Sequence, residues 1–214
     1  MVVKRWMVAA CTVLATSAAT ADVRPAPQEP TKTAVLDMGP GCRMSVTVPE
    51  AARESGSPEG GGSGSITIEN PLNLKRKTYI EPFYLRFICY DADSEVVTNG
   101  WGKRLPSGEW VASVSSSDEP LFRGALRAHQ VHSVNASGWA VAVDDVIGDE
   151  RYRLRRLYYC VIHEPKAVCG HSEMGLLTQI RRHPKHDLTP YALKILRSIE
   201  FLDDAVQAAP AASR

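Results

Sequence analysis

The 214 residues include 25 lysines and arginines against 24 aspartates and glutamates, a formal net charge of +1 at pH 7. Hydrophobic residues make up 44% of the chain and charged residues 23%, which is ordinary for a globular domain. A near-neutral chain lacks the basic excess on which generic nucleic-acid binding depends, so we expect no nucleic-acid partner.

The first 21 residues have the order of a secretory signal peptide. Lys4 and Arg5 form a positive n-region, and a largely apolar stretch follows at residues 6–15. Ala19-Thr20-Ala21 then places small residues at positions −3 and −1 of a cleavage site. We therefore expect export, a periplasmic location and cleavage after Ala21.

Cleavage at this point would remove two basic residues and no acid, which changes the net charge from +1 to −1. The remaining residues 22–214 are enough for one domain with its own core. No stretch reaches the ~20 apolar residues of a membrane span, so we expect no transmembrane segment in the mature chain. Two alternatives stay open: a lipobox ending at Cys11, which leaves a short apolar region, and a buried N-terminal helix.

The predicted domain spans residues 34–202 and begins with short strands and loops. Residues 22–33 contain three prolines and are expected to form an extended lead-in. Residues 55–65 are nearly all Gly, Ser, Pro and Glu, which predicts a flexible surface loop. Side chains alternate along residues 82–90, which predicts a strand with one face in the core. Further expected elements are strands at 34–38 and 42–48 and a helical turn at 49–54.

The second half of the domain is expected to contain longer strands. Residues 138–145 and 152–162 would form a hairpin around Gly148-Asp149. In one plausible register Asp144 faces Arg153, an exposed ion pair worth well under ~1 kcal/mol. Two further strands are expected at 110–114 and 126–134.

Four cysteines remain after the predicted cleavage, an even number in an oxidising compartment. Strands on either side of Glu164-Pro165 would place Cys160 and Cys169 directly opposite each other. Opposed β-carbons lie ~4.5–5.5 Å apart, close to what a disulfide needs. This pairing would leave Cys42 to bond with Cys89, and buried free thiols are the alternative.

The chain ends with a predicted helix and a short strand. Thr189-Pro190 is typical of a helix start, with a hydroxyl at the N-cap and proline at the first helical position. The helix would run to about Arg197 and bury Leu193 and Leu196, with Ile195 at its edge. A closing strand at 199–202 and a disordered tail at 203–214 follow. Antiparallel strands with a late helix predict an α+β sandwich.

The segment from Thr189 to Phe201, Thr-Pro-Tyr-Ala-Leu-Lys-Ile-Leu-Arg-Ser-Ile-Glu-Phe, resembles the closing helix and strand of PsbP-like domains. Val46-Thr-Val-Pro49 resembles their opening strand. The Gly138-Trp139 strand, the Cys160 to Cys169 hairpin and the late helix are similar to exported proteins of the type VI secretion lipase-immunity group. These resemblances imply an antiparallel sheet with a C-terminal helix packed on it, and a periplasmic immunity protein.

Two histidine pairs have metal-like spacing. His129 and His132 would point to opposite faces of a strand, which disfavours a shared metal. His183 and His186 lie in a basic stretch that repels a cation. Neither pair follows the helical metalloprotease pattern, and the chain has no Cys-x-x-Cys pair for zinc or redox chemistry. We expect no metal site and no cofactor.

A serine nucleophile would need a tight Gly-x-Ser-x-Gly elbow. Ser63 and Ser65 lie among glycines without completing that pattern. In Gly170-His171-Ser172 the second glycine, Gly175, falls one residue late. A cysteine nucleophile is disfavoured in an oxidising compartment. We therefore expect that the protein is not an enzyme.

The remaining expectation is a binding module. It would neutralise a secreted antibacterial enzyme by covering its active site, with residues 55–65 and 146–151 as first candidates for the contact. From Arg151 to Asp187 basic residues outnumber acids by five, either a solvated surface or a partner-selecting interface. The alternative is a general envelope protein, either an assembly factor or a lipid or small-ligand carrier, which an apolar pocket between helix and sheet would favour.

Overall fold

The computed structural model describes residues 29–58, 62–72 and 80–202. The predicted signal peptide with its cleavage position, the alternative lipobox at Cys11, most of the lead-in and the tail at 203–214 lie outside these residues. Within the described ranges, no helix has the length and apolar character needed to cross a membrane.

Strands make up most of the described chain, and the helices are short. The strands are β1 (Thr31–Asp37), β2 (Arg43–Pro49), β3 (Arg53–Ser57), β4 (Ser63–Ile68), β5 (Phe83–Asp91), β6 (Gly102–Arg104), β7 (Trp110–Ala112), β8 (Leu126–His132), β9 (Ser137–Asp144), β10 (Leu154–His163), β11 (Lys166–Leu176) and β12 (Glu200–Phe201). The helices are α1 (Glu95–Thr98), α2 (Leu177–Arg182) and α3 (Thr189–Arg197), with 3-10 turns η1 (Glu150–Tyr152) and η2 (Pro184–His186).

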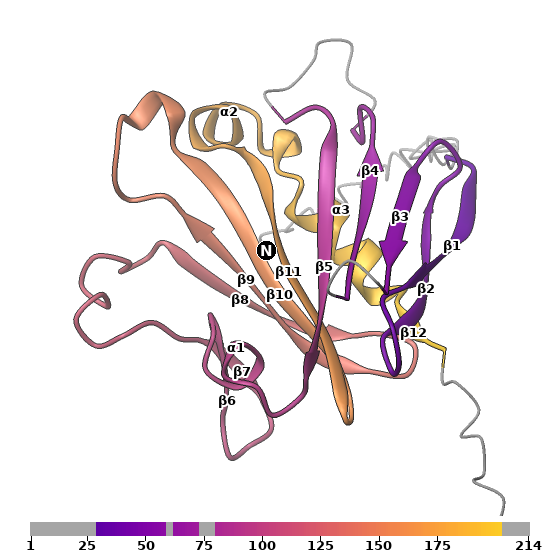
Figure 1. The fold of residues 1–214 in the computed structure, drawn as a ribbon. Coiled ribbons are helices and arrows are strands. Elements are labelled where there is room, and N and C mark those ends of the chain that lie inside the picture. The colour runs from indigo at the N-terminus through magenta and orange to yellow at the C-terminus, as the bar shows by residue number, and fades with distance from the viewer. Residues whose placement is uncertain (1–28, 59–61, 73–79, 203–214) are drawn as a thin grey trace, which may run out of the picture.

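The centre of the fold is a seven-stranded antiparallel sheet in the order β3-β4-β5-β11-β10-β9-β8 (Figure 1). Strand β5 follows the predicted alternation: Phe83, Leu85 and Phe87 are buried, and Tyr84 between them is exposed. Successive side chains of a strand point to opposite faces, so this pattern seats one face of β5 in the core.

Helix α3 and the three-stranded sheet β1-β2-β12 cover one face of the large sheet. The predicted buried face of α3, with Leu193 and Leu196, joins the main core. The predicted cap is wrong: Thr189 is the first helical residue, and Asp187 Oδ1 accepts a hydrogen bond from its N–H at 2.9 Å. The predicted α+β class, with a C-terminal helix on an antiparallel sheet, is confirmed.

The opposite face of the large sheet is covered by the segment between β5 and β8, which carries α1, β6 and β7. A second buried cluster forms here around Trp139, together with Val97 and Trp110. Trp139 Nε1 donates a hydrogen bond to Val97 O at 3.2 Å. Gly102 of β6 lies directly on the Trp139 ring, where a β-carbon would be only 2.3 Å from Cδ2. One tryptophan of the sheet therefore holds two parts of the covering segment.

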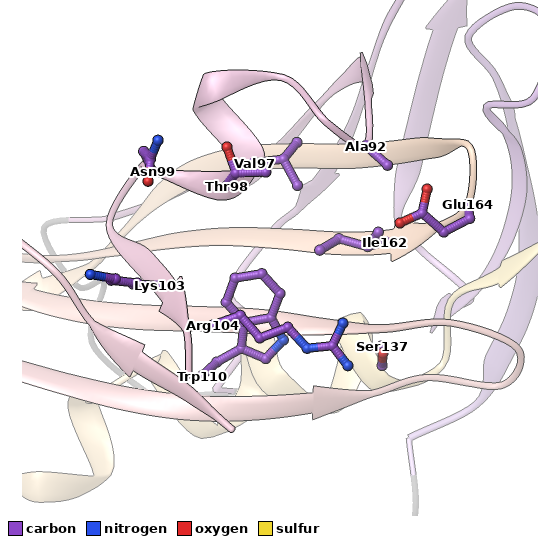
Figure 2. A pocket seen from close by; sticks show the side chains of 10 residues that line it. All are labelled: Ala92, Val97, Thr98, Asn99, Lys103, Arg104, Trp110, Ser137, Ile162 and Glu164. Atoms are coloured by element: carbon purple, nitrogen blue, oxygen red, sulfur yellow. The ribbon is translucent and has the colours of Figure 1, made fainter. Parts of the chain in front are cut away.

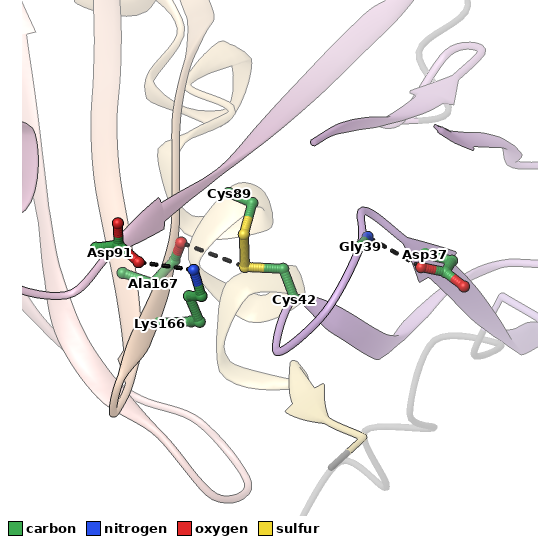
Figure 3. The surroundings of a disulfide bond; sticks show 7 residues. All are labelled: Asp37, Gly39, Cys42, Cys89, Asp91, Lys166 and Ala167. Carbon is green, nitrogen blue, oxygen red and sulfur yellow. Dashed lines mark hydrogen bonds and ion pairs between the residues drawn. A yellow bond between two sulfur atoms is a disulfide. The ribbon is translucent and has the colours of Figure 1, made fainter. Parts of the chain in front are cut away.

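Two disulfides join the pairs that the hairpin argument predicts. Cys42, in the turn between β1 and β2, is bonded to Cys89 near the end of β5, with 5.9 Å between the α-carbons (Figure 3). Cys160 and Cys169 face each other in the β10–β11 register, with α-carbons 4.0 Å apart. The first disulfide ties the small sheet to the large one, and the second lies within one hairpin.

The prediction of a flexible loop at residues 55–65 is wrong at both of its ends. Residues 55–57 belong to β3 and residues 63–65 to β4, and the two strands pair antiparallel. A β-carbon on Gly56 would lie 3.0 Å from the backbone oxygen of Asp37, and one on Gly64 would lie 3.1 Å from Met38 Sδ. The small residues therefore allow the hairpin to approach the end of β1 closely, which composition alone does not reveal.

Two neighbouring boundaries also differ from the prediction. Strand β1 begins at Thr31, inside the predicted lead-in at 22–33. The predicted helical turn at 49–54 is a tight turn, in which Ala52 N–H donates to Pro49 O at 2.9 Å, followed directly by β3.

The β9–β10 pairing differs from the predicted register. Asp144 faces Arg155 rather than Arg153. The connection at residues 145–153 contains the 3-10 turn η1, which moves the midpoint of the hairpin one residue along the chain. The ion pair also forms in a largely buried place, unlike the exposed pair that the sequence predicts.

Candidate functional site

The connection between β9 and β10, residues 145–153, is here named the β9–β10 loop. It carries the two most exposed large hydrophobic side chains of the described residues, Ile147 at 73% and Tyr152 at 64%. The loop extends from the end of the large sheet beside α2, in orange in Figure 1. Both side chains lie on one projecting loop, where a partner protein could cover them.

Hydrogen bonds fix the shape of this loop. At its base, Asp145 N–H donates to Leu154 O at 2.9 Å, and Asp145 Oδ2 accepts from Leu154 N–H at 3.1 Å. At its tip, Nε and Nη2 of Arg153 both donate to Gly148 O at 3.1 Å. Gly148 has a φ of 87°, which glycine adopts without the strain that a side chain would bring. The loop is therefore preorganised at both ends.

Fixed charges flank the exposed Tyr152 ring. Asp149 Oδ2 accepts from Arg151 Nη2 at 2.7 Å, and hydrogen bonds from Arg151 lower the pKa of the Asp149 carboxyl. The Arg151 guanidinium carbon lies 5.6 Å from the centre of the Tyr152 ring, within cation–π range. Glu150 pairs with Arg181 of α2 at 2.9 Å. The loop thus presents apolar groups between charges that are already held in place.

The basic excess between residues 151 and 187 is largely neutralised in the folded protein. Acids from outside this stretch pair with four of its basic residues: Asp144 with Arg155, Asp145 with Arg156, Glu150 with Arg181 and Asp91 with Lys166. Asp187, within the stretch, also pairs with Arg155. This distribution is that of a mixed, internally paired surface.

The described parts of the two regions predicted from sequence to contact a partner do not come together; residues 59–61 lie outside the described residues. Residues 55–57 lie in β3, at one edge of the large sheet, whereas the β9–β10 loop joins two strands near the other edge. Of the two, only the loop carries large exposed apolar side chains in the described residues. We therefore take the β9–β10 loop as the candidate site.

The histidine pairs have different surroundings. His129 is half-buried in β8, where burial lowers its pKa, and His132 is exposed on the same strand. His183 follows α2 and His186 ends η2, and their rings lie 5.1 Å apart, centre to centre. In the part of the chain that the structure describes, no three His, Cys, Asp or Glu residues are grouped as metal ligands would be.

The serines considered as candidate nucleophiles lie in strands rather than in a nucleophile elbow. Ser63 and Ser65 belong to β4. Ser172 is buried in β11, and its hydroxyl donates to the backbone oxygen of Tyr84 on β5. That hydroxyl therefore bridges two segments of the large sheet.

A cavity of about 350 Å³ lies between helix α3 and the small sheet. Tyr191 and Ile195 of α3 line it together with Val48 of β2. An apolar pocket between helix and sheet is the feature expected of a ligand carrier. This cavity meets that expectation in part, because polar and charged residues such as Glu29 and Lys194 line it as well.

Ile147 and Tyr152 are absent from the site residues predicted by sequence. The sequence does carry a signal, because Val146-Ile147 is an apolar pair inside an otherwise acidic turn, Asp144-Asp145 and Asp149-Glu150. An apolar pair between acids is equally compatible with a buried turn, so only the fold reveals its exposure.

No protein-family model matches the chain, and no curated protein matches it. Among solved structures, the chain is similar to the solution structure of cyanobacterial PsbP (CyanoP) from Synechocystis. That similarity has a TM-score of 0.43 and 9% sequence identity, and covers 86% of this chain and 99% of the other. It carries no inference about activity.

Proposed function

We propose that the protein is an exported, non-catalytic immunity protein that neutralises a toxic secreted enzyme by placing the β9–β10 loop over that enzyme's active site. The observation that carries the proposal is the preorganised loop with Ile147 and Tyr152 exposed on it. Tyrosine and arginine are enriched among the residues that dominate binding energy at interfaces, and this loop presents Tyr152 beside Arg151.

The shape of the loop supports occlusion as the mechanism. Active sites are concave, and a projecting loop is the complementary shape. A loop that is already held by hydrogen bonds loses little conformational entropy on binding, which favours affinity. The side chains of Ile147 and Tyr152, on entering such a cleft, would also displace water from the catalytic groups of the enzyme.

The disulfide bonds support a location in an oxidising compartment. Two disulfides fit an oxidising environment such as the periplasm or the cell exterior. Together with the predicted signal peptide, they favour a protein that meets its partner outside the cytoplasm.

The test is a pull-down with the full chain, tagged at its C-terminus and exported in its own cells. We expect one stoichiometric, salt-resistant protein partner that is toxic when produced alone in the periplasm. Ile147→Ser combined with Tyr152→Ala should weaken that binding about 30-fold or more, as loss of a hot spot does. Val134→Ser removes a side chain that is 63% exposed, in the β8–β9 connection, and should leave binding unchanged.

Two outcomes would contradict the proposal. One is a partner that the loop variant binds as tightly as the unmodified chain does. The other is a strain without this protein that is no more sensitive to the effectors of its siblings than its parent is.

A ligand carrier is the second candidate, and the cavity between α3 and β2 favours it. It predicts a small molecule that co-purifies with the exported chain and is detected by native mass spectrometry. Ile195→Trp, which would fill that cavity, should abolish this mass shift.

A further inference from the structure

A cavity of about 400 Å³ opens on the face of the large sheet opposite helix α3, beneath the segment that carries α1, β6 and β7 (Figure 2). Its volume lies within the range of small-molecule sites, which is roughly 300–1,000 Å³. Val97 of α1, Trp110 of β7 and Ile162 of β10 give it apolar walls. No residue of the β9–β10 loop lines it, so this site does not depend on the proposed immunity function.

The walls of this cavity are held by contacts beneath them. Gln130 of β8 accepts a hydrogen bond from Trp110 N–H at 3.1 Å and donates to Trp110 O at 2.6 Å, which fixes β7 on the sheet. Trp139 fixes α1 through its hydrogen bond to Val97 O, and β6 through the close approach of Gly102. The cavity is therefore preformed, and a ligand would not need to order it.

Opposite charges face this cavity from different elements. Arg104 comes from β6 and Glu164 from the turn between β10 and β11, and both side chains are directed into the space in Figure 2. The Nε of Arg104 donates to Gly108 O at 3.4 Å, which leaves the rest of the guanidinium for another acceptor. In the described residues neither Arg104 nor Glu164 forms an ion pair.

We propose that this cavity binds a zwitterionic ligand of the size of an amino acid or short peptide. Its carboxylate would pair with Arg104, its ammonium group with Glu164, and its apolar part would lie against Trp110. Guanidinium–carboxylate pairs are strong and directional, and they strengthen where water is displaced. Lys103 also lines the cavity, but its amine points away from Arg104 and Glu164 in Figure 2. A phosphate or other dianion beside Arg104 would meet the Glu164 carboxylate, which repels it. Asn99 and Ser137 supply further hydrogen-bonding groups on the rim.

The test uses the dipeptide alanyl-leucine as the probe and the full chain labelled with nitrogen-15. We expect saturable shifts of the amide signals of Arg104 and Trp110. N-acetyl-alanyl-leucine lacks the ammonium group and alanyl-leucinamide lacks the carboxylate, so each should bind about tenfold more weakly or worse, as loss of a charged hydrogen bond predicts.

Matched variants assign the two charges. Arg104→Gln and Glu164→Gln should each weaken binding of alanyl-leucine about tenfold or more, and both should keep the unfolding temperature because these side chains are exposed. Arg123→Gln removes an exposed arginine that does not line the cavity and should leave binding unchanged. Three results would overturn the proposal: absence of shifts at tens of millimolar dipeptide, equal binding of the blocked peptides, or equal binding by Arg104→Gln.

Discussion

The guanidinium of Arg155 lies between the carboxylates of Asp144 and Asp187. Its Nε donates to Asp144 Oδ1 at 2.6 Å, and its Nη1 donates to Asp187 Oδ2 at 2.7 Å. Asp144 ends β9, whereas Asp187 accepts a hydrogen bond from the N–H of Thr189, the first residue of α3. The side chains of the three charged residues are only 11–17% exposed. One arginine therefore couples the β9–β10 hairpin to the closing helix.

Arg155→Ala should destabilise the fold strongly. Removing one partner from a largely buried network leaves the remaining charges without compensation, which costs about 3–5 kcal/mol. Urea unfolding followed by circular dichroism measures this loss. Arg53→Ala breaks the exposed pair with Glu69 and should cost less than about 1 kcal/mol. Equal effects of the two changes would show that the Arg155 network contributes nothing beyond a surface pair.

The same network predicts loss of stability in acid. Burial by itself raises the pKa of Asp144, but the hydrogen bonds and positive charges of Arg155 and Arg127 outweigh it and hold that pKa below its ordinary value. A carboxyl group with a lowered pKa in the folded state stabilises the fold above its unfolded pKa, which is about 4. This contribution is lost as the pH falls through the lower, folded value. The free energy of unfolding should therefore fall below about pH 4.

Asp144→Asn isolates that contribution. The variant should be less stable than the unmodified chain at neutral pH, and its stability should decline less between about pH 4 and about pH 2. Chemical denaturation at a series of pH values measures how the free energy of unfolding changes with pH in each protein. Parallel slopes would assign the acid sensitivity to other carboxyl groups.

The two disulfides should differ in their contribution to stability. Cys42 and Cys89 are 47 residues apart in the chain, whereas Cys160 and Cys169 are 9 apart. Loop-closure entropy gives about 4 kcal/mol for the longer loop and about 2.6 kcal/mol for the shorter one. The paired β10 and β11 strands also hold the second pair together without the bond. Thermal unfolding of the two double Cys→Ala variants should therefore show the larger loss for Cys42 with Cys89, and the reverse order would contradict this argument.

Sequence predicts those elements whose signal is local. The alternation along β5 and the Thr189-Pro190 helix start lie within a few residues, and both give the right element. Cys160 and Cys169 face each other because the turn between their strands is short, and the length of a short turn fixes the register of the hairpin. Longer connections carry no such constraint, and the 3-10 turn in the β9–β10 loop moves Asp144 opposite Arg155.

Other parts of the fold depend on tertiary contacts that no local sequence pattern indicates. The glycines of residues 55–65 have the composition of a flexible loop, yet Gly56 and Gly64 serve close packing against the end of β1. Strand β11 continues to Leu176 and is followed by α2, although this stretch contains polar residues that hide its alternation. The exposure of Ile147 and Tyr152 likewise follows from where the loop projects, and no local pattern specifies it.

Gly102→Ala tests the packing that forms the cavity of Figure 2. The new β-carbon would lie 2.3 Å from Cδ2 and 2.4 Å from Cγ of Trp139, so β6 or the indole ring must move. The ring is held by its hydrogen bond to Val97 O, and overpacking at such a place costs about 1–3 kcal/mol. We expect this loss in urea unfolding, together with a change in the near-ultraviolet circular dichroism of the tryptophans.

Gly124→Ala is the matched control for that change. Gly124 has a φ of 76°, and a β-carbon at this position would have no neighbour within 4 Å, so the substitution adds backbone strain without a collision. It should lower stability modestly and leave the tryptophan signal unchanged. If Gly102→Ala behaves in the same way as Gly124→Ala, the contact between β6 and Trp139 is not tight. The preformed cavity that depends on this contact would then lose its support.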